Sequence, residues 1–132
     1  MDYLSAEWCA RFRALGSRVN EPGLSYTAQF LVYGAPDGDV IYHCSVVHGS
    51  LMDLALGPLT TADISVSLPY ETSKAWVEGA DVLEQAFLSG EVRIGGDAEA
   101  LARLTAHRLT PGFIGVLRQL NEETSYAVQP SN

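Results

Sequence analysis

Hydrophobic residues along the chain are spaced first as in a helix, then as in strands, and then again as in helices. Between residues 3 and 15, large apolar side chains recur at i, i+4, i+8 and i+11, which predicts an amphipathic N-terminal helix. Gly16 is expected to end this helix. Its apolar face consists of Leu4, Trp8, Phe12 and Leu15.

Apolar and polar residues alternate through the next part of the chain, as they do in strands with one buried face. Asp37-Gly38, between the first two alternating runs, is a strong hairpin signal. In the third run the alternation places Met52, Leu54 and Leu56 on one face. The four strands predicted in this way span residues 24–34, 40–48, 51–56 and 62–68.

After Pro69 the spacing becomes helical again, interrupted by one short strand. Thr110 followed by Pro111 is a common helix start, with a capping hydroxyl before a proline in the first turn. Because strands and helices are segregated along the chain, we expect an α+β fold in which consecutive strands form an antiparallel meander. The later elements are a helix at 70–78, a helix capped by Asp81 with Val82, Leu83, Ala86 and Phe87 on one face, a strand containing Val92 and Ile94, a helix at 98–107 capped by Asp97, and a helix at 110–122.

The size and composition fit one soluble globular domain spanning residues 1–132. Hydrophobic residues make up 47% of the 132 residues and charged residues only 18%, which excludes a disordered chain. A net charge of −8 disfavours nucleic acid and anionic membranes as partners. No apolar run is long enough to cross a membrane, and charged residues near the start argue against a signal peptide. We therefore expect a cytoplasmic protein of bacterial type, with Cys9 and Cys44 as buried free thiols.

Residues able to do chemistry are scattered and match no known catalytic or metal-binding spacing. His43 and His48 lie at odd separation in a strand and so point to opposite faces. His107 ends a helix, where a positive charge suits the helix dipole. The sequence therefore predicts no metal site, no cofactor and no catalytic residue. An isomerase- or cyclase-type enzyme that uses Tyr42, His43 or Asp53 as acid or base remains an alternative.

One stretch of the sequence, residues 62–104, resembles the sterol carrier protein 2 family. That family shows an alternating strand with an Asp, a short helix ending in Gly, and a helix with Ala-Phe before a Gly. A short strand and a Gly-Asp pair opening an apolar helix then follow. The matching positions are Ala62-Asp63, Gly79, Ala86-Phe87, Gly90, Gly96-Asp97, Leu101 and Leu104.

This resemblance implies a five-stranded, mostly antiparallel sheet covered on one face by about five helices. Between sheet and helices the family has a cavity for sterols, fatty acids, acyl-CoA or other lipids. The first and last helices close the cavity. Phe113, Leu117 and Leu120 on the helix at 110–122 are candidates for a mobile lid, because Gly112 and Gly115 lie near the start of that helix. The candidate ligand-binding residues are Trp8, Phe12, Phe30, Val32, Cys44, Val46, Leu54, Val66, Trp76, Leu83, Phe87, Leu104, Phe113 and Leu117.

Composition alone leaves open whether these side chains line a cavity or fill a solid core. The leading hypothesis is a non-catalytic carrier of lipid or another apolar small molecule, without stable insertion into a membrane. The second is an accessory subunit of the same fold with a filled core, working beside an enzyme. A homodimer is also left open.

Overall fold

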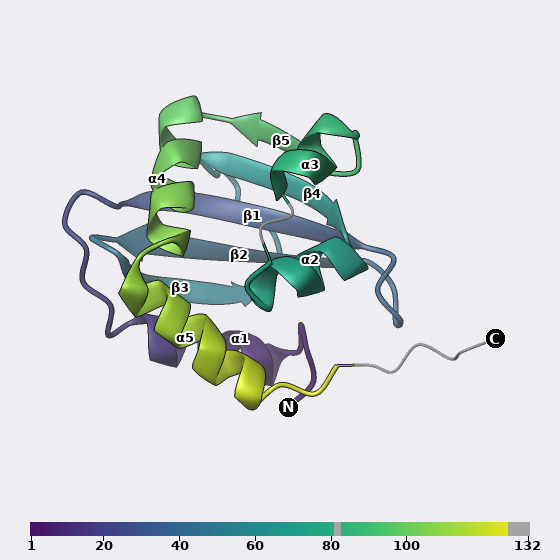
Figure 1. Ribbon diagram of the computed structural model, residues 1–132, viewed down its shortest axis with the longest axis horizontal. Coiled ribbons are helices and arrows are strands. Elements are labelled where there is room, and N and C mark those ends of the chain that lie inside the picture. The colour runs from purple at the N-terminus through teal and green to yellow at the C-terminus, as the bar shows by residue number, and fades with distance from the viewer. Residues whose placement is uncertain (81–82, 127–132) are drawn as a thin grey trace.

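The fold is an α+β arrangement in which helices cover one face of a sheet (Figure 1). A computed structural model describes residues 1–80 and 83–126, apart from the side chains of Leu83 and Glu84. Asp81 and Val82, expected at the start of the third helix, lie outside the described residues. The elements are α1 (Ala6–Gly16), β1 (Tyr26–Tyr33), β2 (Val40–Val47), β3 (Ser50–Leu56), β4 (Ile64–Pro69), α2 (Tyr70–Val77), α3 (Leu83–Leu88), β5 (Arg93–Gly96), α4 (Ala98–Arg108) and α5 (Pro111–Glu122).

The sheet is mixed, with the strand order β3-β2-β1-β4-β5. β1 pairs antiparallel with β2 and parallel with β4, while β4 pairs antiparallel with β5. The expected meander is therefore wrong at β4, which crosses over to lie beside β1 and not beside β3. Thr27 and Asp63 fix this crossing, because each backbone amide donates to the other residue's side-chain oxygen, at 3.0 and 2.9 Å. Alternation predicts which residues face the core but not which strands become neighbours.

A β-bulge in β3 shifts the side chains of that strand. Ser45 pairs with Asp53 and Val46 pairs with Leu51, so Met52 has no partner in the ladder. Leu51 and Leu54 are consequently the buried residues of β3, while Met52 and Leu56 are exposed. The expectation that Met52, Leu54 and Leu56 share one face is wrong at Met52, because the extra residue of the bulge breaks the alternation there. Leu54 and Leu56 stay in phase, opposite Cys44 and Tyr42, although Leu56 is exposed at the end of the strand.

Helices begin where side chains cap them. Ser5 accepts a hydrogen bond from the Trp8 amide, so α1 begins at Ala6, later than the expected residue 3. Asp97 and Thr110 cap α4 and α5 as predicted, accepting from the amides of Glu99 and Phe113. Each cap satisfies an amide that would otherwise lack a partner at the helix start.

The hydrophobic core lies between the sheet and the helices. Figure 1 shows α2, α3 and α4 in front of the sheet and α5 near its β3 edge, where α1 also packs. Residues of β1 alternate in burial, with Tyr26, Ala28, Phe30 and Val32 facing this core. The opposite face carries polar pairs such as Gln29 and Ser65, whose side chains are 3.0 Å apart. The hydrophobic core therefore lies against one face of the sheet, the face that the helices cover.

Candidate functional site

A small apolar pocket lies in the core between the sheet and the helices. Its volume is about 20 Å³, which is room for roughly one water molecule. Three strands form its floor, and four helices form its walls. The lining residues are Phe12 from α1, Tyr26 and Phe30 from β1, Tyr42 and Cys44 from β2, Leu51 and Leu54 from β3, Trp76 from α2, Leu104 and Arg108 from α4, and Phe113 from α5.

The structure brings many of the predicted binding residues together at this pocket and places the others around it. Those that line it are Phe12, Phe30, Cys44, Leu54, Trp76, Leu104 and Phe113. Those buried in the core without lining it are Trp8, Val32, Val46, Val66 and Leu117. The side chain of Leu83 lies outside the described residues.

Phe87 lies away from the core. Its side chain is 50% exposed, whereas its neighbour Ala86 is buried. Their expected common inward face is therefore wrong, since successive residues of a helix point in different directions and only Ala86 of the two turns towards the core. The other predicted binding residues whose side chains are described lie in or around the core.

Sequence reasoning missed four of the lining residues. Tyr26 stands in phase with Phe30 along β1, so the alternation already placed it on the inner face. The inward orientation of Leu51 was not predicted, because the bulge reverses it relative to the alternation of β3. Arg108 gave no signal, because a charged residue at a helix end is usually solvated. Tyr42 was considered only as an acid or base, although it faces the core between two other aromatic rings.

A buried hydrogen-bonded chain joins one wall of the pocket to the turn between β2 and β3. The Tyr26 hydroxyl lies 2.7 Å from Nδ1 of His107, and Nε2 of His107 lies 2.9 Å from the carbonyl oxygen of Gly49. Because a carbonyl can only accept, Nε2 carries the hydrogen, and the Tyr26 hydroxyl donates to Nδ1. Burial lowers the pKa of His107, so the ring is neutral at neutral pH. The expected role of His107 as a positive charge at a helix end is therefore wrong.

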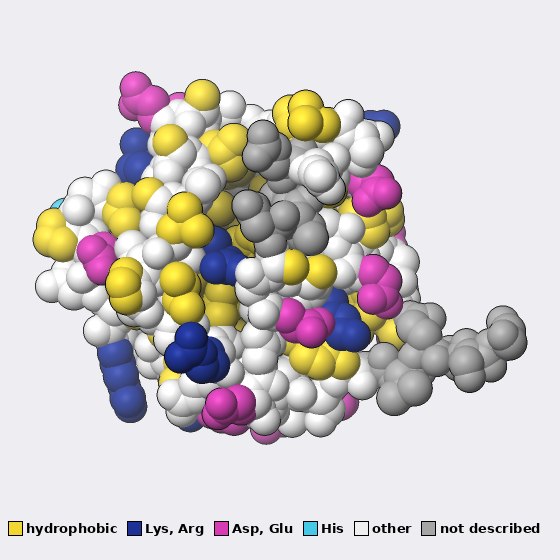
Figure 2. Space-filling view, viewed as in Figure 1, with side chains coloured by type: hydrophobic (Ala, Val, Ile, Leu, Met, Phe, Trp, Pro, Cys, Tyr) yellow, Lys and Arg dark blue, Asp and Glu magenta, His cyan; other side chains and the backbone are white. Residues whose placement is uncertain are grey.

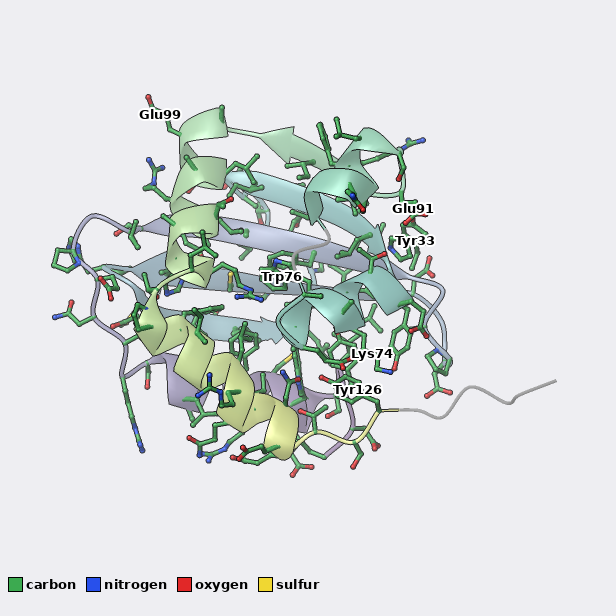
Figure 3. All side chains as sticks on the ribbon, viewed as in Figure 1. Tyr33, Lys74, Trp76, Glu91, Glu99 and Tyr126 are labelled. Atoms are coloured by element: carbon green, nitrogen blue, oxygen red, sulfur yellow. The ribbon has the colours of Figure 1, made fainter. Side chains whose placement is uncertain are left out.

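Trp76 and Arg108 close the outer side of the pocket. Trp76 lies near the C-terminal end of α2, in front of the sheet (Figure 3), and both side chains are partly exposed. The Arg108 guanidinium lies 5.3 Å from the centre of the Trp76 ring and donates to the Trp76 carbonyl at 3.0 Å. Hydrophobic side chains are visible between α4 and α2 on this face of the molecule (Figure 2). The two residues therefore link α2 to α4 across the opening of the pocket.

The thiols and hydroxyls of the pocket region are protonated at neutral pH. Burial raises the pKa of Cys44 to about 12 and that of Cys9 to about 11. Burial also raises the pKa of the Tyr42 hydroxyl well above its usual range. Both cysteines are free and buried, as the sequence predicts. Neither thiol has the lowered pKa that an activated nucleophile needs.

The three candidate acid–base residues do not converge on one site. His43 contacts Asp53 and the Gly57 carbonyl, with distances of 3.2 Å from Nε2 and 2.7 Å from Nδ1. His43 follows Tyr42 in β2, so these two side chains lie on opposite faces of the sheet. Within residues 1–80 and 83–126, no three metal-binding side chains cluster together. No described helix is long and apolar enough to cross a bilayer.

Comparisons with known proteins give a consistent answer at the level of the fold. No protein-family model matches the sequence, and no curated protein matches it. Among solved structures, sterol carrier protein 2 superposes with a TM-score of 0.62 at 12% identity, covering 94% of this chain and 100% of that chain. Sterol carrier protein 2-like 2 from Aedes aegypti has a TM-score of 0.60 at 17% identity, covering 79% and 94%.

A third solved structure is a ubiquinone synthesis protein, UbiJ-SCP2, with a TM-score of 0.55 at 15% identity, covering 80% of this chain and 88% of that chain. The Aedes aegypti protein has also been solved in a palmitated form, with a TM-score of 0.55 at 17% identity, covering 79% and 89%. At sequence identities this low, the comparisons show a shared arrangement of helices and strands but do not show a shared ligand. The chain therefore has the sterol carrier protein 2 fold.

Proposed function

We propose that this protein binds and carries an apolar ligand, such as a sterol, a fatty acid, an acyl-CoA or a related lipid, without a catalytic step. The observation that carries the proposal is the pocket between sheet and helices, lined by apolar and aromatic side chains from seven elements. A pocket with mainly apolar walls and a few polar groups is the common form of a small-molecule site. The palmitated and ubiquinone-related proteins of the same fold support a ligand of this class.

The energetics favour opening of the pocket for such a ligand. A pocket of about 20 Å³ is far smaller than a lipid, so side chains must move when one binds. The movable part is the partly exposed pair Trp76 and Arg108, whose cation–π contact is worth about 0.5–1 kcal/mol at an exposed site. A chain of about twelve methylenes gains roughly 10 kcal/mol on burial. The gain from burying the ligand therefore exceeds the combined loss of this contact and of the hydrogen bond from Arg108 to the Trp76 carbonyl, which is worth about 1.5–3 kcal/mol.

A second candidate function is that of an accessory subunit with a filled core. The small volume of the pocket favours it, because a well-packed interior needs no ligand for stability. The two functions differ in what the isolated protein does. A carrier binds lipid by itself, whereas an accessory subunit leaves lipid in solution and acts only beside its partner.

The test is direct binding. The purified protein is extracted with organic solvent and examined for co-purified lipid by mass spectrometry, and the delipidated protein is then titrated with a fluorescent fatty acid. We expect bound lipid or micromolar binding, and the absence of both would favour the accessory subunit.

A pair of variants locates the binding site. Leu104→Phe adds a ring inside the pocket and is expected to weaken binding about tenfold or more. Leu109→Phe is the matched control, because Leu109 is 65% exposed just after α4. Equal binding by two folded variants would place the ligand elsewhere.

A further inference from the structure

Two hydrogen-bond donors, one fully buried behind the pocket and one on a residue that lines it, have no acceptor among the described residues. The indole Nε1 of Trp8 is fully buried and without a partner within the described part of the chain. The hydroxyl of Tyr42, a residue only 3% exposed, also forms no hydrogen bond with any described residue. Most buried polar side-chain atoms in proteins have a partner, so the unpartnered Trp8 indole beside an unpaired Tyr42 hydroxyl needs an explanation.

Both donors belong to one aromatic layer beside the pocket. The Trp8 and Tyr42 rings meet edge to face with centroids 5.7 Å apart, and Tyr42 stacks on Phe30 at 4.9 Å. Tyr42 and Phe30 line the pocket, as does Phe12, which contacts Trp8 at 5.3 Å. Tyr42 therefore forms part of the floor of the proposed ligand site, and the Trp8 ring lies directly behind it.

The other tyrosine of the pocket floor is different. The Tyr26 hydroxyl donates to His107 and so has its donor satisfied inside the protein. A Trp N–H can only donate, and burial keeps the Tyr42 hydroxyl protonated. What this end of the pocket lacks is an acceptor, and a carbonyl oxygen offers two lone pairs without bringing a further donor.

We propose that Tyr42, with Trp8 behind it, recognises a carbonyl oxygen on the innermost part of the bound ligand. This proposal rests on the carrier function above and makes it more specific. The preferred ligand is an apolar chain or ring that carries a keto or ester group, and not a plain hydrocarbon. The polar group then enters the pocket first, while the apolar part fills the space opened towards Trp76 and Arg108.

The test compares two probes that differ by one oxygen. Dodecan-2-one and dodecane are used to displace a fluorescent fatty acid from the delipidated full chain. The wild type is expected to prefer the ketone, and Tyr42→Phe to weaken ketone binding about 5- to 50-fold while changing dodecane binding less than about twofold. Tyr26→Phe is the matched control, because it removes a hydroxyl from the same floor that is already paired. It is expected to leave the ratio of the two affinities unchanged.

NMR spectroscopy tests the second donor, the indole N–H of Trp8. In ¹H–¹⁵N spectra the indole signal of Trp8 is separated from that of Trp76 with the Trp76→Phe variant. Dodecan-2-one is expected to move the Trp8 indole proton downfield, and dodecane to leave it in place. A Trp8 signal that is the same with both probes would show that water, or no acceptor, lies at this donor.

The outcomes separate this proposal from the carrier function on which it rests. An unchanged preference for the ketone in a folded Tyr42→Phe variant would overturn the role of Tyr42 while leaving the carrier function standing. Absence of binding by both probes and by the fluorescent fatty acid in the wild type would overturn both.

Discussion

The Tyr26 hydroxyl and Nδ1 of His107 are 2.7 Å apart in a buried hydrogen bond that connects β1 to the end of α4. In the neutral ring Nδ1 accepts from the Tyr26 hydroxyl, because Nε2 carries the hydrogen that it donates to the Gly49 carbonyl. Protonation of His107 would reverse this bond, since the Tyr26 hydroxyl can also accept, and would place a charge in the core, where burial disfavours it. The stability of the fold is therefore tied to the protonation state of one histidine.

The first prediction concerns acid destabilisation through His107. Burial holds the pKa of His107 in the folded protein below its usual range, whereas the unfolded chain titrates near 6.5. Between these two pKa values the unfolded state binds the proton and the folded state does not, so stability falls as the pH falls through this window. The loss approaches at most about 1.4 kcal/mol per pH unit and ends below the folded-state pKa.

Urea unfolding at several pH values from 7.5 to 5 measures this effect. The His107→Gln variant is the control, because it removes the titrating group and should reduce the pH slope in this range. An equal slope in wild type and variant would assign the acid sensitivity to other groups.

The second prediction concerns the close packing of α1 on β3. A methyl group on Gly16 would collide with the Leu51 side chain, whereas one on Gly115 in α5 would meet no atom within 4 Å other than the backbone of its own helix and its chain neighbours. Gly16→Ala is expected to destabilise the protein by about 1–3 kcal/mol despite the better helix propensity of alanine. Gly115→Ala is expected to stabilise it by up to about 1 kcal/mol. Thermal unfolding of both variants checks the pair, and the same direction of change in both would contradict this packing.

The third prediction concerns the start of α5. The Thr110 hydroxyl accepts a hydrogen bond from the Phe113 amide at 3.3 Å and donates to the His107 carbonyl at 2.8 Å. Thr110→Ala removes both bonds and is expected to cost about 1 kcal/mol of unfolding free energy, whereas Thr110→Ser should retain most of the stability. Chemical denaturation measures the difference, and equal losses in the two variants would show that the hydroxyl does not act as a cap.

Local sequence patterns predicted the elements of this fold well but not all of their relationships. Asp97 and Thr110 act as the caps that their positions before helices indicate, since capping depends only on neighbouring residues. The neighbour of β4 was not predictable in this way, because the reciprocal bonds of Thr27 and Asp63 join residues far apart in the sequence. The mixed order of the sheet follows from that distant contact.

In the candidate site, too, local patterns predicted some of the residues and missed others. Phe30 and Leu104 line the pocket because each stands in phase with the buried face of its own element. Leu51 was missed, because the bulge in β3 breaks the phase from which its orientation would be read. Arg108 was missed for another reason, since only the position of Trp76 on a different helix gives its guanidinium a place at the pocket opening.

The last prediction uses the two thiols to detect opening of the pocket. Cys44 lines the pocket and Cys9 does not, although both are buried and free. If lipid enters by displacing Trp76 and Arg108, the open form exposes Cys44 and a bound lipid covers it again. Cys44 in a Cys9→Ser variant should therefore react slowly with a small neutral alkylating reagent, and several-fold more slowly when saturating palmitate is present.

Cys9 in a Cys44→Ser variant supplies the comparison for this experiment. Its thiol is reached only by a larger unfolding of α1 from the sheet, so palmitate should protect it only as far as it stabilises the whole fold. Stronger protection of Cys44 than of Cys9 supports a ligand in the pocket between β2 and the helices. Equal protection would mean that palmitate binds without occupying that pocket, and no protection of either thiol would favour the accessory subunit, whose core stays filled.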